Sequence, residues 1–80
     1  MKAIVNISLK EGVLDSQGKA VHHALDALKF EGIEDVRIGK QIVLKLSSTD
    51  EASARKEVTE MCESLLANTV IEDYEIELIL

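Results

Sequence analysis

Few side chains in this 80-residue sequence could carry out catalysis by themselves. Cys62 is the single cysteine, and it lies among apolar neighbours at helical spacing, which predicts a buried core thiol rather than a nucleophile. His22 and His23 are the only histidines. Adjacent residues on a helix point about 100° apart, so these two imidazoles cannot chelate one metal ion together. We interpret them as exposed surface histidines.

The remaining polar patterns also lack a catalytic arrangement. The four glycines are scattered rather than gathered in a phosphate-binding loop, and a bend or turn explains Gly39-Lys40 better. We interpret the acidic run Glu72–Glu77 first as the solvated side of a strand, with a docking surface as the alternative. The sequence therefore predicts no catalytic, cofactor-binding or metal site. It favours a binding or assembly module over a small stand-alone enzyme.

Charge and composition narrow the class of partner. The chain has 9 basic and 15 acidic side chains, a formal net charge of −6, and a hydrophobic fraction of 46%. A single globular domain over residues 1–80 is expected. The acidic excess argues against nucleic acid and against anionic membrane surfaces, because both require basic patches. No apolar run approaches the roughly 20 residues of a spanning helix, so we expect a cytoplasmic protein, for which a free cysteine is normal.

Hydrophobic periodicity predicts a strand at each end of the chain and two helices between them. Alternation indicates strands over 2–10 and 74–80. The first helix follows Asp15 as its cap and ends near Gly32, and the second begins around Ser48–Glu51. Ser48 and Glu51 have capping-box spacing, although Thr49 or Asp50 could serve as the cap. The apolar stripes are Ala20, Val21, Ala24, Leu25 and Leu28 in the first helix and Ala54, Val58, Met61, Cys62, Leu65 and Leu66 in the second.

The segment Val36–Leu46 admits two interpretations. Its apolar residues share one parity, so a single long strand bent at Gly39 would place them all on one face. A split strand with a three-residue loop at Gly39–Gln41 is the second choice. Either way the order is strand, helix, long bent or split strand, helix, strand. This order predicts an α+β, ferredoxin-like two-layer sandwich in which both helices cover one face of an antiparallel sheet.

The small size of the chain predicts association with other copies. A domain of this length buries little of its surface, and one cysteine allows no internal disulfide. The sheet face away from the helices carries Ile4, Val43 and Ile79 among polar residues, and an outer strand leaves backbone groups unpaired. We therefore expect a homo-oligomer, a dimer or a tetramer, joined through the sheet face or edge. Asn68 is expected to end the second helix in a left-handed conformation.

Three stretches go beyond periodicity and closely resemble the PurS family, the small subunits of phosphoribosylformylglycinamidine (FGAM) synthase. They are Leu14–Val21, Asp35–Lys40 and Met61–Tyr74, and the likeness extends over the whole chain in order and spacing. The family usually has proline where this chain has Ser16. Serine is also acceptable at the first helical position, so the difference affects helix stability only slightly.

The resemblance implies a non-catalytic subunit of a glutamine-dependent, ATP-consuming carbon–nitrogen ligase in de novo purine biosynthesis. In the split form of this enzyme, the PurS subunit bridges the PurL synthetase and the PurQ glutaminase, so that glutamine-derived ammonia reaches formylglycinamide ribonucleotide. ATP and Mg are used by the assembled complex. This subunit itself is expected to bind neither ATP nor Mg.

Partner contacts are expected at the polar and glycine positions of these motifs, which a buried core does not require. They are Asp15, Gln17, Gly18, Lys19, Arg37, Gly39, Lys40, Asn68 and Thr69. The alternative is that Asp15, Gly39 and Asn68 serve only as a cap, a bend and a terminator. A further alternative for the whole chain is an oligomeric ferredoxin-like module that senses a small molecule.

Overall fold

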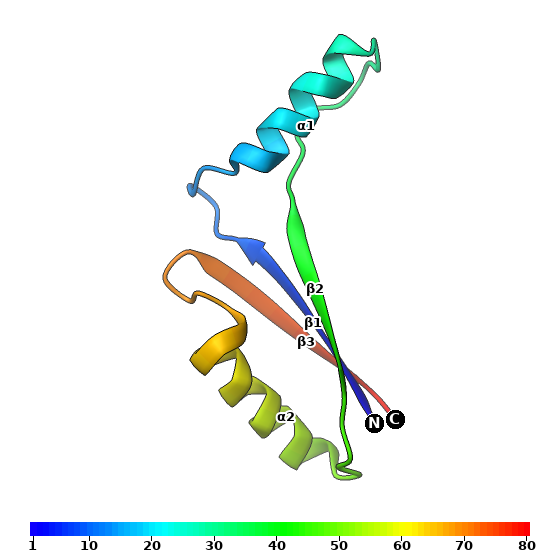
Figure 1. Cartoon of the computed structure of the whole chain (residues 1–80), viewed down its shortest axis with the longest axis vertical. Coiled ribbons are helices and arrows are strands. Elements are labelled where there is room, and N and C mark those ends of the chain that lie inside the picture. The colour runs from blue at the N-terminus through cyan, green and yellow to red at the C-terminus, as the bar shows by residue number, and fades with distance from the viewer.

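The computed structural model describes residues 1–80 as a three-stranded antiparallel sheet with two helices (Figure 1). Along the chain the elements are β1 Lys2–Leu9, α1 Ser16–Ala27, β2 Gly39–Lys45, α2 Glu51–Met61, a π-helical turn Cys62–Leu66 and β3 Glu72–Ile79. The strand order is β2-β1-β3, so the strand nearest the N-terminus lies in the centre. The α+β class and the order of elements agree with the sequence. None of the helices combines the length and apolar character needed to cross a membrane.

The core lies between the sheet and α2. Val5 of β1 pairs with Ile42 of β2 and Ile76 of β3, so odd-numbered residues of β1 share a face with even-numbered residues of its neighbours. The cluster that this face forms with α2 and the following turn consists of Ala3, Val5, Ile7, Val58, Cys62 and Ala67. Cys62 is fully buried, as predicted, and burial raises the pKa of its thiol.

The end of the second helix departs from the predicted apolar stripe. Ala67 donates its N–H to the carbonyl of Cys62 at 3.1 Å, which closes a π-helical turn instead of an α-turn. Because the wider turn breaks the 3.6-residue period, Leu65 is left 82% exposed. Asn68 is not left-handed, since Lys29 is the only non-glycine residue with positive φ. It forms a tight turn before β3 instead.

The placement of the helices differs from the expected sandwich. Only α2 lies on the sheet, whereas α1 projects beyond its end (Figure 1). Gly18 is the only buried residue of α1, and Leu28 is 68% exposed. The chain then returns along the helix, where the carbonyl of Ile33 lies 2.9 Å from His22 Nε2. We call residues 16–38, which comprise α1 and this returning segment, the arm; no other part of the chain covers its apolar side chains.

The middle segment runs through Gly39 without a hairpin, so the split-strand alternative is wrong. Pairing with β1 begins only at Gly39, opposite Ser8. Before Gly39, the backbone groups that could have continued the pairing are bonded to side chains instead. Arg37 Nη2 donates to the carbonyl of Leu9 at 2.9 Å, and Ile38 N–H donates to Asp15 Oδ2 at 2.7 Å. Strand β2 is therefore shorter than the expected strand Val36–Leu46, because side chains rather than strand pairing form the hydrogen bonds of its first residues.

Two helix boundaries also differ from the predicted ones. Helix α1 ends at Ala27 rather than near Gly32, and Lys29 takes the left-handed position with φ 72°. Phe30 N–H bonds the carbonyl of Leu25 at 3.1 Å, which is the pattern of a Schellman motif with lysine in place of glycine. The cap of α2 is Asp50, one of the three candidates, rather than the Ser48 capping box.

Candidate functional site

Asp15 lies at the point where the arm meets the sheet. Its residue surface is only 7% exposed. As predicted it caps α1, with Oδ1 accepting the N–H of Gly18 at 2.8 Å, and its Oδ2 also accepts the N–H of Ile38 at 2.7 Å. One carboxylate thus binds both the first turn of α1 and the segment that enters β2. We call Asp15, Gly18, Arg37, Ile38 and Gly39 the joint.

Both glycines of the joint allow close backbone approach. A Cβ atom on Gly18 would lie 2.4 Å from the carbonyl oxygen of Val36, and one on Gly39 would lie 2.6 Å from that of Ile7. Both oxygens belong to the backbone, so neither can move aside at little cost as the end of a flexible side chain could. Gly18 and Gly39 are therefore required by the internal fit of the joint, whatever else they contact.

The hydrogen bonds from Ile38 and Gly18, with a smaller contribution from the Arg37 charge, hold the pKa of Asp15 below its ordinary value. The stabilisation from this carboxylate is therefore complete above about pH 4 and is lost as the pH falls through the lowered folded pKa. We expect Asp15→Asn to be less stable than the wild-type chain at pH 7, with a difference that shrinks towards pH 3. Urea unfolding at the two pH values measures this, and an equal difference at both would contradict it.

Glu72, at the start of β3, connects two of the predicted positions. Its Oε1 accepts the N–H of Asn68 at 2.7 Å, and its Oε2 lies 3.7 Å from Lys40 Nζ. Glu72 belongs to the acidic run that we interpreted as solvated, but its side chain is only 16% exposed. Its parity with Tyr74 and Ile76, which places it on the core side of β3, was the signal that could have identified it.

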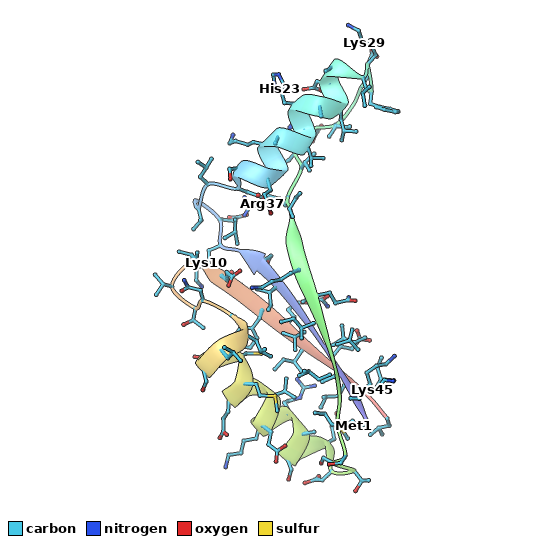
Figure 2. All side chains as sticks on the ribbon, viewed as in Figure 1. Met1, Lys10, His23, Lys29, Arg37 and Lys45 are labelled. Atoms are coloured by element: carbon cyan, nitrogen blue, oxygen red, sulfur yellow. The ribbon has the colours of Figure 1, made fainter.

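The structure brings most of the predicted docking residues to one end of the sheet. Asp15, Gln17, Gly39 and Lys40 line a groove of about 200 Å³ together with Glu72. Figure 2 shows Arg37 and Lys10 at this same end. Five predicted residues do not line this groove: Gly18 and Arg37 belong to the joint, Asn68 is bonded to Glu72, Lys19 is exposed on α1, and Thr69 lines a neighbouring groove of about 380 Å³. Contact of these residues with a partner stays a prediction.

Two titratable side chains outside the joint, Tyr74 and His22, have structural partners. Tyr74 donates its hydroxyl proton to Glu63 Oε2 at 2.7 Å, and this hydrogen bond raises the pKa of Tyr74 to about 12. His22 is half-buried against the returning segment, so the expected exposure holds for His23 but not for His22. No three His, Cys, Asp or Glu side chains are grouped to hold a metal ion.

Comparison with known proteins gives a consistent set of relatives. The family model PurS, described as phosphoribosylformylglycinamidine (FGAM) synthase, matches residues 2–79. The chain is 53% identical over 76 residues to the phosphoribosylformylglycinamidine synthase subunit PurS of Bacillus subtilis, covering 95% of this chain and 89% of that one. It is 43% identical to the PurS subunit of Methanocaldococcus jannaschii, covering 95% and 92% of the two chains.

Solved structures agree with the sequence comparison. The structure of Bacillus subtilis PurS matches with a TM-score of 0.85 at 53% identity, covering 95% of this chain and 94% of that one. A chain in the structure of PurLQS from Thermotoga maritima matches with a TM-score of 0.87 at 29% identity, covering 95% and 93%.

Proposed function

This chain belongs to the PurS family of phosphoribosylformylglycinamidine synthase subunits, and we propose that it joins the PurL synthetase to the PurQ glutaminase. It is a subunit of a ligase of purine biosynthesis. The observation that carries the bridging role is the gathering of Asp15, Gln17, Arg37 and Lys40 at one end of a small domain. A related chain is present in a PurLQS structure, which supports the same role.

The chemistry of the reaction explains why a bridge is useful. Glutamine hydrolysis releases ammonia, which is lost to bulk water and to protonation unless the glutaminase is docked to the synthetase that consumes it. In this proposal ATP and Mg bind the larger subunits and this chain supplies contact surface only. A cytoplasmic location belongs to the proposal, since the free thiol Cys62 suits a reducing compartment.

Charge reversal at the groove tests the docking role. We expect Lys40→Glu to weaken binding to the larger subunits about tenfold, because it places a second carboxylate beside Glu72 on a contact surface. Lys56→Glu on the exposed side of α2 is the matched control. Binding is measured by pull-down and calorimetry with purified PurL and PurQ, and circular dichroism checks the fold. Equal binding by the two variants would remove Lys40 from the interface.

Gene deletion tests the function as a whole. Loss of the chain should produce purine auxotrophy, and a plasmid copy should restore growth only when PurL and PurQ are present. Growth without added purines after deletion would refute the role. Calorimetric binding of a nucleotide or amino acid by the isolated chain would instead favour the small-molecule-sensing alternative.

We also propose that the working form is a homo-oligomer in which the arm of one copy packs against another copy. Only 9 of the 80 residues are buried, and Leu28 and Phe30 of the arm are 68% and 58% exposed. On the sheet, Ile42 and Leu44 of β2 are only half-buried on the face that α2 covers in part. An arm from a second copy would cover this face and give each sheet the second helix that the sequence pattern predicts.

A further inference from the structure

The arm is long enough to cover its own sheet, yet the chain holds it away from that sheet. The arm leaves β1 and returns to β2 at the same end of the sheet (Figure 1). Helix α1 has 12 residues and is about 18 Å long, and the seven residues of β2 span about 23 Å. If the arm folded back, α1 would therefore fit along β2, where Ile42 and Leu44 are only half-buried.

An arm that was free to bend would close on its own sheet. Two surfaces joined by a short flexible connection meet at an effective concentration in the millimolar range, about a thousandfold above a micromolar protein solution. Closure within one chain would then compete successfully with packing on another copy. Exchange of arms between copies therefore requires something that keeps each arm from its own sheet.

The first connection of the arm could bend without difficulty. Residues 10–14 belong to no helix or strand. Gly12 lies there with φ +85°, and a Cβ atom added to it would meet nothing within 4 Å, so no close packing holds this turn in place. The direction of the arm is therefore not set by residues 10–14 alone.

Two side chains of the joint connect the outgoing segment to the returning one. Arg37 Nη2 donates to the carbonyls of Leu9 at 2.9 Å and Lys10 at 3.4 Å, and the N–H of Ile38 donates to Asp15 Oδ2 at 2.7 Å. These bonds link the two segments beyond the point where β1 and β2 stop pairing. Folding back would bend both segments at this level and break the bonds.

The arm itself is held together along its length, so it turns as one unit. The first turn of α1 lies against the returning segment, because a Cβ atom on Gly18 would be 2.4 Å from the carbonyl oxygen of Val36. Farther along, His22 Nε2 lies 2.9 Å from the carbonyl of Ile33. Resting on the homo-oligomer of the proposed function, we propose that Asp15 and Arg37 form a lock that holds the arm open for another copy and prevents closure on its own sheet.

Removal of the lock tests this role. In the double variant Asp15→Asn with Arg37→Ala, the dissociation constant for self-association should rise at least about tenfold, because closure competes with exchange. Arg37→Ala alone changes an exposed side chain and should shift in the same direction, so it serves if the double variant does not fold. Arg55→Ala is the matched control, since Arg55 Nη1 also donates to a carbonyl, that of Ile76 at 3.4 Å, away from the joint.

The position of the arm is measured within single chains. Spin labels are attached to cysteines introduced by His23→Cys on the arm and Lys45→Cys at the far end of the sheet, and labelled chains are mixed with an excess of unlabelled chains (Figure 2). Cys62 is fully buried and does not compete for the label. Closure should shorten the distance between the labels by at least about 15 Å, the length of ten helical residues. Sedimentation velocity measures self-association, and circular dichroism checks the fold.

Each outcome decides the proposal. Weaker self-association together with the shorter distance, in the lock variants but not in Arg55→Ala, supports the lock. An unchanged distance in the lock variants overturns it, because the arm would stay open without these side chains. Shortening in Arg55→Ala as well overturns it too. If the wild-type chain is monomeric, arm exchange in the proposed function fails, and the distance alone then decides whether the lock exists.

Discussion

Replacing Gly18 with alanine should destabilise the chain by about 2 to 3 kcal/mol, the cost typical of forcing extra atoms into a closely packed site. The added Cβ would lie 2.4 Å from the carbonyl oxygen of Val36 and 2.6 Å from Asp15 Oδ2. The Val36 oxygen is part of the backbone, and the Asp15 carboxylate is held by two N–H groups. Relief of the clash requires the first turn of α1 to move away from the returning segment at Val36, which breaks the bonds of Asp15.

A second glycine provides the control for this substitution. Gly32 has φ +84°, and a Cβ atom added there would meet nothing within 4 Å, so Gly32→Ala adds conformational strain of about 1 kcal/mol without a clash. Urea unfolding of both variants at one protein concentration measures the difference. A Gly18→Ala chain within about 0.5 kcal/mol of wild type would show that the joint is not closely packed.

The same substitution should also change the direction of the arm. The joint is the connection between α1 and the sheet, because α1 itself projects beyond the sheet (Figure 1). If Gly18→Ala lets the arm rotate, the apolar side chains of α1 no longer present one fixed surface to another copy. Weaker self-association would accompany the loss of stability, whereas Gly32→Ala should self-associate normally.

Local patterns in the sequence were enough to predict the sheet. The alternation of apolar residues places Val5, Ile42 and Ile76 on one face, and the structure pairs these three residues directly. Asp15 was identified as a cap from its position before an apolar stripe, and the hydrogen bond to Gly18 confirms it. The face on which each strand residue lies and the cap of α1 depend on residues only a few positions apart, so the pattern along the chain is sufficient to predict them.

Long-range interactions account for what the sequence did not reveal. The second bond of Asp15 reaches Ile38, and Glu72 reaches Lys40, across separations that no short motif encodes. The position of α1 depends on what covers its apolar face, and within one chain nothing does. Amphipathic spacing predicts that a helix buries one side but does not identify the surface on which it is buried. The sequence therefore predicts two helices on the sheet of one copy, whereas only α2 covers that sheet.

Substitution of Leu28 by aspartate should separate the homo-oligomer into monomers with little effect on the folding of each chain. Leu28 is 68% exposed at the end of α1, so a charge there meets water in the isolated chain. Within the proposed contact the same charge would be buried against apolar side chains of the partner copy. A penalty of about 3 kcal/mol or more corresponds to at least about a hundredfold rise in the dissociation constant.

Sedimentation velocity at micromolar concentration provides the measurement, with two comparison variants. Leu65→Asp alters a residue of similar exposure away from the arm and should leave the oligomer intact. Val43→Asp places a charge on the open face of the sheet, where Val43 is 50% exposed opposite Ile4. Dissociation by Val43→Asp but not by Leu28→Asp would move the contact from the arm to the open sheet face. A wild-type chain that is monomeric under these conditions would exclude both contacts, because a surface used for self-association must be occupied when copies are abundant.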